Sequence, residues 1–160
     1  MTPTSSAQPR VNRLLLTGAA GGLGKVLRQR LGQYADILRL SDIAQLEPAS
    51  GPHEEVVPCD LSDKAAVHAL VEGVDAILHF GGVSVERPFE EILGANISGT
   101  FHIYEAARRH GVKRVVFASS NHATGAYEKD APYQQVVTGD YTGLQPGSFD
   151  RISADSPIRP

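Results

Sequence analysis

The chain has 160 residues, of which 41% are hydrophobic and 21% charged, and its formal net charge is −3. This size suits one domain with a buried core, and the slightly negative charge argues against a nucleic-acid or anionic-membrane partner. Cys59 is the single cysteine, which excludes an intrachain disulfide and a cysteine-rich metal site, and no two of the six histidines have metal-ligand spacing.

Residues 1–12 are predicted to form a flexible tail. The stretch up to Arg10 is rich in Thr, Ser, Pro and Gln and lacks the hydrophobic centre of a signal peptide. Elsewhere no run approaches the ~18 apolar residues of a membrane-spanning helix. A single cysteine fits a reducing compartment, so we expect a cytoplasmic protein without membrane or nucleic-acid partners.

The stretch Leu14–Gly24 combines a strand, a glycine turn and the start of a helix. Its three consecutive leucines predict a strand over Arg13–Thr17 that is buried on both faces, as parallel strands are. The following residues have helical periodicity, which predicts a helix over Gly22–Gly32. The apolar stripe of this helix is expected to be Leu23, Val26, Leu27 and Leu31, with Arg30 at its margin.

The glycines of this turn recur at every third residue, as Gly18, Gly21 and Gly24. Between a strand and a helix, this pattern is typical of a site for a dinucleotide pyrophosphate. Gly18 would permit the tight turn, Gly21 would let the backbone approach the phosphates, and Gly24 would let the helix pack closely on the strand. The helix N-terminus would offer free N–H groups to the anion. The alternative is a glycine-rich turn that binds nothing.

Further along the chain, predicted strands and helices alternate. The later strands are expected at Ile37–Ser41, Glu55–Cys59, Ala76–Phe80 and Arg114–Ala118. The later helices are expected at Lys64–Glu72, Phe89–Leu93 and Asn96–His110. Such alternation requires parallel pairing through right-handed crossovers. The predicted fold class is therefore α/β, a doubly wound, Rossmann-like parallel sheet with strand order 3-2-1-4-5.

Two of these helices have predicted ends and faces. Ser62 with Asp63 is expected to cap the helix Lys64–Glu72, and Gly111 to end the helix Asn96–His110. The shared face of the first is expected to contain Ala66, Ala69 and Leu70. The second carries a stripe of Ile97, Phe101, Tyr104 and Arg108, with Ile103 and Ala107 beside it.

Residues 123–160 differ from the rest because apolar periodicity is lost and glycines and prolines are frequent. We interpret residues 13–122 as a dinucleotide-binding domain. Residues 123–160 are predicted to be an irregular region, either active-site loops or the lead into a C-terminal half that is absent from this chain.

In a doubly wound sheet, ligands lie beyond the carboxyl ends of the strands. Asp42 ends the second predicted strand, where a carboxylate accepts hydrogen bonds from both ribose hydroxyls and repels a 2′-phosphate. Lys25 is the opposing signal, since a basic side chain beside the glycine turn suits a 2′-phosphate. Asp42 has the position that the dinucleotide fingerprint specifies, so NAD is predicted rather than NADP. A loop-capping acid is the alternative for Asp42.

Other strand ends carry further candidates. Asp60 is an acceptor for the adenine amino group or a cap on the following helix. Gly81 and Gly82 would let the chain pass close under a cofactor, or they form a plain turn. His79, within an apolar strand, is predicted to be a hydrogen-bonded core residue rather than a ligand, and Cys59 a small buried apolar residue.

The fifth predicted strand is followed by polar residues. Ser120 is a hydrogen-bond donor for a substrate hydroxyl or carbonyl, and Asn121 and His122 could fix sugar hydroxyls or a carboxylate. A polar turn is the alternative on residue type alone. The topology favours a site, because this strand end is nearest the nicotinamide in a doubly wound fold.

Together the motifs resemble those of the extended short-chain dehydrogenase/reductase family, which includes NAD-dependent epimerases and dehydratases. The resemblance covers about Asn12–His122, weakens from Ala123 to Asp150 and resumes at Ser156–Pro160. It rests on Thr17-Gly18-x-x-Gly21-x-x-Gly24, Asp42, Cys59-Asp60-Leu61, His79-Phe80-Gly81-Gly82, Asn96 and Ser119-Ser120. Within the family, the runs most similar to bacterial sugar-acid dehydrogenases are Leu14–Gly24, Ile37–Asp42, His79–Phe89 and Phe117–His122.

This resemblance implies an NAD-dependent oxidation of the C1 hydroxyl of D-glucuronate or D-galacturonate to an aldarolactone, by a homo-oligomer when the enzyme is full length. It implies cofactor contacts at Gly18, Gly21, Gly22, Leu23, Gly24, Asp42, Ile43, Asp60, Leu61, Gly81, Gly82 and Val83. It implies contacts with the small sugar acid at Ser84, Ser120, Asn121 and His122. Ser120 would be the catalytic serine, and no metal is implied.

One family motif is missing. The family's proton acceptor is a Tyr followed four residues later by a Lys that lowers the phenol pKa, and these 160 residues contain no Tyr-x-x-x-Lys. The chain is therefore expected to be an incomplete N-terminal part that is inactive alone. Two alternatives stay open: a nucleotide-sugar epimerase or dehydratase of the same fold, and a non-catalytic dinucleotide-binding protein.

Overall fold

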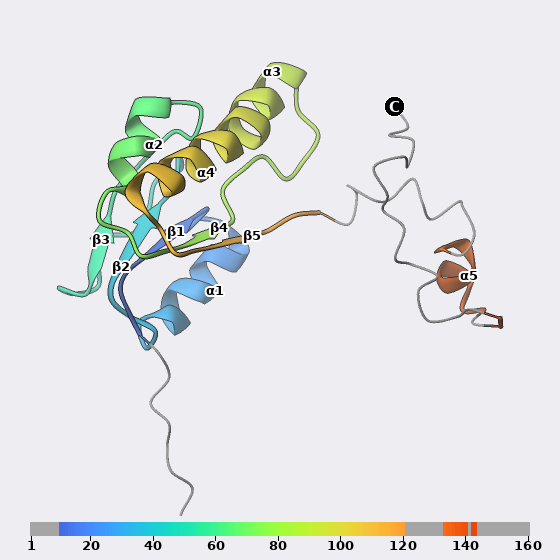
Figure 1. The fold of residues 1–160 in the computed structure, drawn as a ribbon, viewed down its shortest axis with the longest axis horizontal. Coiled ribbons are helices and arrows are strands. Elements are labelled where there is room, and N and C mark those ends of the chain that lie inside the picture. Colours follow the sequence, from blue (N-terminus) through green and yellow to red (C-terminus); the bar gives the residue numbers. More distant parts are fainter. Residues whose placement is uncertain (1–9, 121–132, 141, 144–160) are drawn as a thin grey trace, which may run out of the picture. The chain divides into compact units, whose positions relative to one another are not determined.

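A computed structural model of the chain describes residues 10–120, 133–140, 142 and 143. It divides into two compact units, residues 1–118 and 119–160. The first is a five-stranded parallel sheet in the order β3-β2-β1-β4-β5 (Figure 1), which confirms the predicted doubly wound topology. Its strands are β1 (Val11–Thr17), β2 (Ala35–Ser41), β3 (Glu54–Val56), β4 (Ala76–His79) and β5 (Arg114–Phe117).

The helices of the first unit alternate with the strands along the chain. They are α1 (Gly22–Leu31), α2 (Lys64–Val71), α3 (Phe89–Ile92), the π-helix η1 (Leu93–Ser98) and α4 (Gly99–His110). Because η1 joins α3 to α4, the two helices predicted here form one uninterrupted helical run. Gly111 ends α4 in the left-handed conformation at φ 69°, as predicted from the sequence.

Three further features depart from the sequence-based boundaries. β1 begins at Val11, inside the segment predicted as a tail. β3 ends at Val56, short of the predicted Cys59, since Pro58 has no N–H to continue the ladder. The second unit contains one described helix, α5 (Tyr133–Thr138), where no element was expected.

Helices lie on both faces of the sheet (Figure 1), although the edge strand β5 is largely exposed. Leu14 and Leu16 of β1 pack on the side of α1, whereas Leu15 packs with α2 and α4 on the opposite side. All three side chains are buried. This alternation confirms the prediction that β1 is buried on both faces, and it places the carboxyl end of β1 between two layers of helices.

The packed face of α1 differs from the predicted stripe. Leu23 and Val26 are 66% and 47% exposed, so the prediction was wrong for these two residues. It is confirmed for Leu27 and Leu31, which pack against the sheet together with Gly24. Gly24 faces the backbone of Gly18 and Ala19, and Leu23, one position earlier in the helix, is exposed.

The outer helices show the same kind of difference. In α2 the prediction of Asp63 as cap is confirmed, since its side chain accepts hydrogen bonds from the N–H groups of Ala65 and Ala66. Its buried residues are Val67, Leu70 and Val71, whereas the predicted Ala69 is exposed. The predicted stripe of Ile97 in η1 and Phe101, Tyr104 and Arg108 in α4 is exposed. Ile103 and Ala107, predicted beside it, are buried together with Gly99 and Ala106.

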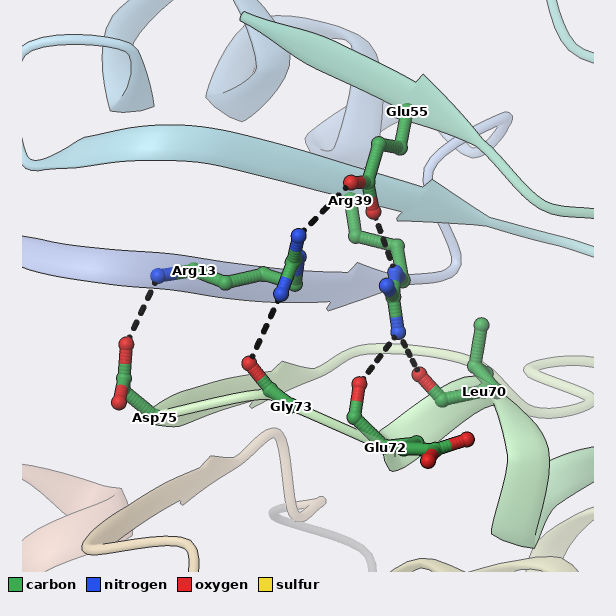
Figure 2. Close-up of polar contacts among 7 residues, drawn as sticks. All are labelled: Arg13, Arg39, Glu55, Leu70, Glu72, Gly73 and Asp75. Atoms are coloured by element: carbon green, nitrogen blue, oxygen red, sulfur yellow. Dashed lines mark hydrogen bonds and ion pairs between the residues drawn. The ribbon is translucent and has the colours of Figure 1, made fainter.

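A charged network ties three strands to the end of α2 (Figure 2). The Glu55 carboxylate accepts from Arg13 of β1 at 3.1 Å and from Arg39 of β2 at 2.7 Å. Burial alone would raise the pKa of Glu55, but these two arginines lower it overall. Arg39 also donates to the carbonyls of Leu70 and Glu72, which closes the C-terminal end of α2.

Candidate functional site

A cleft of about 830 Å³ lies where β1, β2 and β4 end. Thirteen of the residues singled out in the sequence line it: Gly18, Gly21, Gly22, Leu23, Gly24, Asp42, Ile43, Asp60, Leu61, Gly81, Gly82, Val83 and Ser84. Ser120 belongs to the second unit, and Asn121 and His122 lie outside the described residues. The structure thus gathers the predicted cofactor residues around one cleft, while their contact with a cofactor stays a prediction.

The glycine turn is shaped by two close approaches of backbone. Gly18 has φ +72°, and a Cβ there would lie 2.6 Å from the carbonyl of Phe80. A Cβ on Gly24 would lie 2.1 Å from the carbonyl oxygen of Gly18 and 2.7 Å from Cα of Ala19. Gly24 therefore lets α1 pack against the glycine turn itself, rather than against the strand as predicted. A Cβ added to Gly22, by contrast, would have no other atom within 4 Å.

The N-terminus of α1 carries no cap of its own. Its N-cap residue is Gly21, no side chain caps it, and its first turn has no acidic residue. The first N–H groups of a helix have no partner within the helix, so they and the helix dipole favour an anion at this end. With Gly21 and Gly22 lining the cleft, this end of α1 fits a pyrophosphate.

Asp42 holds the turn and the end of β2 together. Its Oδ2 accepts from the N–H of Ala20 at 2.9 Å, and its Oδ1 accepts from the N–H of Ala44 at 3.0 Å. The loop-capping alternative is therefore confirmed as a structural role. The carboxylate still lines the cleft, and each of its oxygens has a second lone pair that can accept from a ribose hydroxyl.

Asp60 is not the cap of α2. Its Oδ1 accepts from the N–H of Ser62 at 2.8 Å, which shapes the turn before the helix, and Asp63 provides the cap. The Asp60 side chain is exposed at the cleft, where Oδ2 is available to the amino group of a base.

His79 and Thr17 form a buried hydrogen-bonded pair behind the cleft. Thr17 Oγ1 accepts from the N–H groups of Phe80 at 3.2 Å and Gly81 at 3.0 Å, and it lies 2.7 Å from His79 Nδ1. Because Oγ1 already accepts twice, its hydrogen points to Nδ1, and the Nε2–H of His79 faces Thr100 Oγ1. Burial lowers the pKa of His79 to about 4, so the ring is neutral at pH 7. The prediction of a hydrogen-bonded core histidine is confirmed.

Replacing Thr17 with valine is expected to lower the free energy of unfolding by about 3 kcal/mol. Thr17→Val keeps the shape but leaves the part-buried N–H of Gly81 and the buried Nδ1 of His79 without their partner, whereas the N–H of Phe80 keeps its bond to the Thr17 carbonyl at 3.3 Å. Each lost partner costs about 1–3 kcal/mol. Thr17→Ser keeps the hydroxyl and is the matched control, expected to lose less than about 1 kcal/mol. Urea unfolding measures both, and equal losses in the two variants would contradict the role of the hydroxyl.

Asn96 of η1 fixes the turn after β4. Its Oδ1 accepts from the N–H of Val83 at 2.7 Å and its Nδ2 donates to the Val83 carbonyl at 2.8 Å. Gly82 has φ +152°, and a Cβ there would lie 2.9 Å from Asn96 Oδ1. The family motif included Asn96, but this role could not be derived from its sequence position. Among the lining residues that the sequence analysis did not assign to the site, Glu90, Glu91, Gly94 and Ala95 come from α3 and η1.

Residues 14–147 match the model of the NAD dependent epimerase/dehydratase family. The chain belongs to this family. Among its relatives, uronate dehydrogenase of Pseudomonas syringae pv. tomato is 74% identical over 130 residues, which are 81% of this chain and 47% of that protein. Uronate dehydrogenase of Agrobacterium fabrum is 60% identical, over 73% of this chain and 44% of that protein.

Solved structures of family members agree with this membership. A crystal structure of uronate dehydrogenase from Agrobacterium tumefaciens complexed with NAD matches with a TM-score of 0.68 and 60% identity, over 71% of this chain and 42% of that chain. Glucuronic acid dehydrogenase from Chromohalobacter salexigens matches with the same TM-score at 59% identity, over 70% and 42% of the two chains. The chain spans about half the length of the curated relatives it matches. In the described parts of the chain, no helix is long and apolar enough to cross a membrane.

Proposed function

We propose that the whole protein oxidises the C1 hydroxyl of a hexuronic acid, glucuronate or galacturonate, to an aldarolactone with NAD. The main support for the proposal is the cleft at the strand ends, which is lined by all the predicted cofactor residues. The chain is also up to 74% identical to uronate dehydrogenases. A cytoplasmic location and assembly of several copies belong to the same proposal.

The cleft residues fit NAD by their chemistry. We propose that the uncapped end of α1 binds the pyrophosphate, with Leu23 beside it, and that Asp42 accepts from the adenosine ribose. Next to Asp42, the exposed side chain of Ile43 can cover the adenosine. Asp60 and Leu61 would meet the adenine, and the segment Gly81–Val83 would line the nicotinamide half. When bound, NAD supplies the acceptor for the hydride that leaves C1.

The sugar acid is proposed to lie beyond the end of β5. Ser120 would donate a hydrogen bond to the reacting oxygen, and Ser84, Asn121 and His122 would bind the remaining hydroxyls and the carboxylate. These 160 residues hold no Tyr-x-x-x-Lys, so the base that removes the C1 hydroxyl proton is proposed to lie outside them. The chain alone is expected to bind NAD without turnover.

A chimera tests this proposal. This chain is joined to the part of the Pseudomonas syringae uronate dehydrogenase that follows the matched residues, and NADH is followed by absorbance with glucuronate or galacturonate. We expect turnover from the chimera, none from the 160-residue chain, and a loss of about 10²-fold or more in kcat with Ser120→Ala. A folded chimera that binds NAD but oxidises neither acid would favour an epimerase or dehydratase, and turnover by the chain alone would contradict the missing base.

Asp42 is expected to set the preference for NAD. Asp42→Asn removes the charge that repels a 2′-phosphate. It also replaces one carboxylate oxygen by an NH2 group, a donor that faces a backbone N–H and cannot accept its hydrogen bond. We expect NAD affinity to fall about tenfold and the NAD/NADP preference to shrink, each tenfold step being about 1.4 kcal/mol. Calorimetric titration of the chain measures both. Asp60→Asn is the control, because it is expected to change NAD and NADP affinity by the same factor.

A further inference from the structure

Two histidines from different helices meet on the surface outside the cleft. His68 lies in the last turn of α2 and His110 is the last residue of α4. His110 Nε2 and His68 Nδ1 are joined by a hydrogen bond of 3.2 Å, and the ring centroids are 4.3 Å apart. The two residues are 42 positions apart in the chain, so no spacing motif could have revealed the pair.

The separation of the nitrogens matches that of two ligands on one metal ion. Imidazole nitrogens bind Zn²⁺ at about 2.0–2.1 Å, which places two of them about 3.3 Å apart in a tetrahedral site. The two nitrogens are the closest polar atoms of the two rings, whose planes are tilted by 57° relative to each other. His68 is exposed and His110 is half-buried. Without metal, one of the two nitrogens donates to the other; with metal, each ring would carry its hydrogen on its other nitrogen and offer a lone pair to the ion.

The two helices that carry the pair are packed against each other. Val67, Leu70 and Val71 of α2 pack in the same buried cluster as Ile103, Ala106 and Ala107 of α4. This packing holds the two helices together whether or not the histidines interact. The two ligand-bearing helices are therefore already held together before an ion binds. This reduces the loss of conformational entropy on binding, which weakens most surface metal sites.

The charges near the pair do not exclude a cation. Arg108 and Arg109 precede His110, but both are ion-paired with Glu105, at 2.8 Å and 2.6 Å. His110 also lies at the C-terminal end of α4, where the helix dipole is negative and favours a positive ion. The C-terminal carbonyls of α2 are already bonded to Arg39.

We propose that His68 Nδ1 and His110 Nε2 form a two-histidine site for a borderline divalent transition metal such as Zn²⁺, Ni²⁺ or Cu²⁺, which links α2 to α4. Among the described residues, no group of three or more His, Cys, Asp or Glu is placed to hold a metal. The remaining positions on the ion are therefore taken by water, which makes this a site of modest affinity that is open to exchange.

Calorimetric titration of the 160-residue chain with NiCl2 and ZnCl2 tests the site. At pH 7.5 we expect one ion to bind per chain. Metal at 100 times Kd should raise the folding equilibrium constant about 100-fold, provided that the unfolded chain does not bind. Cu²⁺ bound to the wild-type chain should show coupling to two imidazole nitrogens by electron paramagnetic resonance, a readout that needs no variant.

His68→Ala and His110→Ala are each expected to weaken binding at least about tenfold. His53→Ala removes an exposed imidazole outside the pair and is the matched control, expected to bind as the wild type does. Unfolding midpoints without metal establish that each variant folds. Wild-type affinity in His110→Ala, an equal loss in His53→Ala, or coupling to fewer than two nitrogens would overturn the proposal.

Discussion

Replacing Gly24 with alanine is expected to lower the free energy of unfolding by about 3 kcal/mol and to abolish measurable NAD binding. The added Cβ would lie 2.1 Å from the carbonyl oxygen of Gly18 and 2.7 Å from Cα of Ala19, so α1 must move away from the glycine turn. These neighbours are backbone atoms, which cannot rotate aside as a side chain can. Urea unfolding of Gly24→Ala and calorimetric titration with NAD measure the two effects.

Gly22→Ala is the matched control for this substitution. It makes the same chemical change in the first turn of the same helix, but its Cβ would meet nothing within 4 Å. Stability is expected to stay within about 0.5 kcal/mol of the wild type, or to rise slightly because alanine favours helix. If both alanine variants were equally unstable, close backbone packing at Gly24 would not be the cause.

The second large effect is expected at Glu54, at the start of the edge strand β3. Its carboxylate accepts from Arg28 of α1 at 2.7 Å and from the N–H of Ser50 at 2.7 Å, and its side chain is only 4% exposed. Glu54→Gln removes the carboxylate that is ion-paired with Arg28, whose own side chain is 15% exposed. Breaking one side of such a buried pair costs about 3–5 kcal/mol, and urea unfolding at pH 7 measures the loss.

The same carboxylate predicts how stability depends on acid. The hydrogen bond from Arg28, assisted by the bond from Ser50 and opposed by burial, lowers the pKa of Glu54 from 4.5 to about 2. Because the folded pKa is depressed, this stabilisation is complete above pH 4.5 and is lost as the pH falls to 2. The wild type should lose more stability than Glu54→Gln across this window. Glu72→Gln, at an exposed side chain, is the control and should follow the wild type; parallel curves for wild type and Glu54→Gln would contradict the argument.

The sheet was predictable because its signals are local. Three leucines before a glycine turn indicate a strand buried on both faces, and the alternation of elements then allows few topologies. The cleft followed from the same reasoning, since residues at strand ends must converge in a parallel sheet. Asp42 and Gly81 could therefore be placed at one site before the structure was considered.

The side-chain environments were not predictable in this way. Helical periodicity identified a stripe on α1, but Leu23 is exposed at the cleft, and Gly24 faces backbone atoms of the glycine turn. Hydrogen bonds between distant residues were also missed. Two hydrogen bonds join Asn96 of η1 to the backbone of Val83, and one joins Thr17 of β1 to His79 of β4. The local spacing of these residues in the sequence does not predict these contacts.

The network of Arg13, Arg39 and Glu55 joins the sheet to the C-terminal end of α2, and none of its residues lines the cleft (Figure 2). Its strength can therefore change without altering the chemistry of the cleft. Laboratory evolution toward a different sugar or cofactor usually accumulates destabilising substitutions. Stabilising substitutions in this cluster, introduced first, would offset the stability lost to later substitutions in the cleft. The two sets of changes in the free energy of unfolding should add, because the two sites share no contacts.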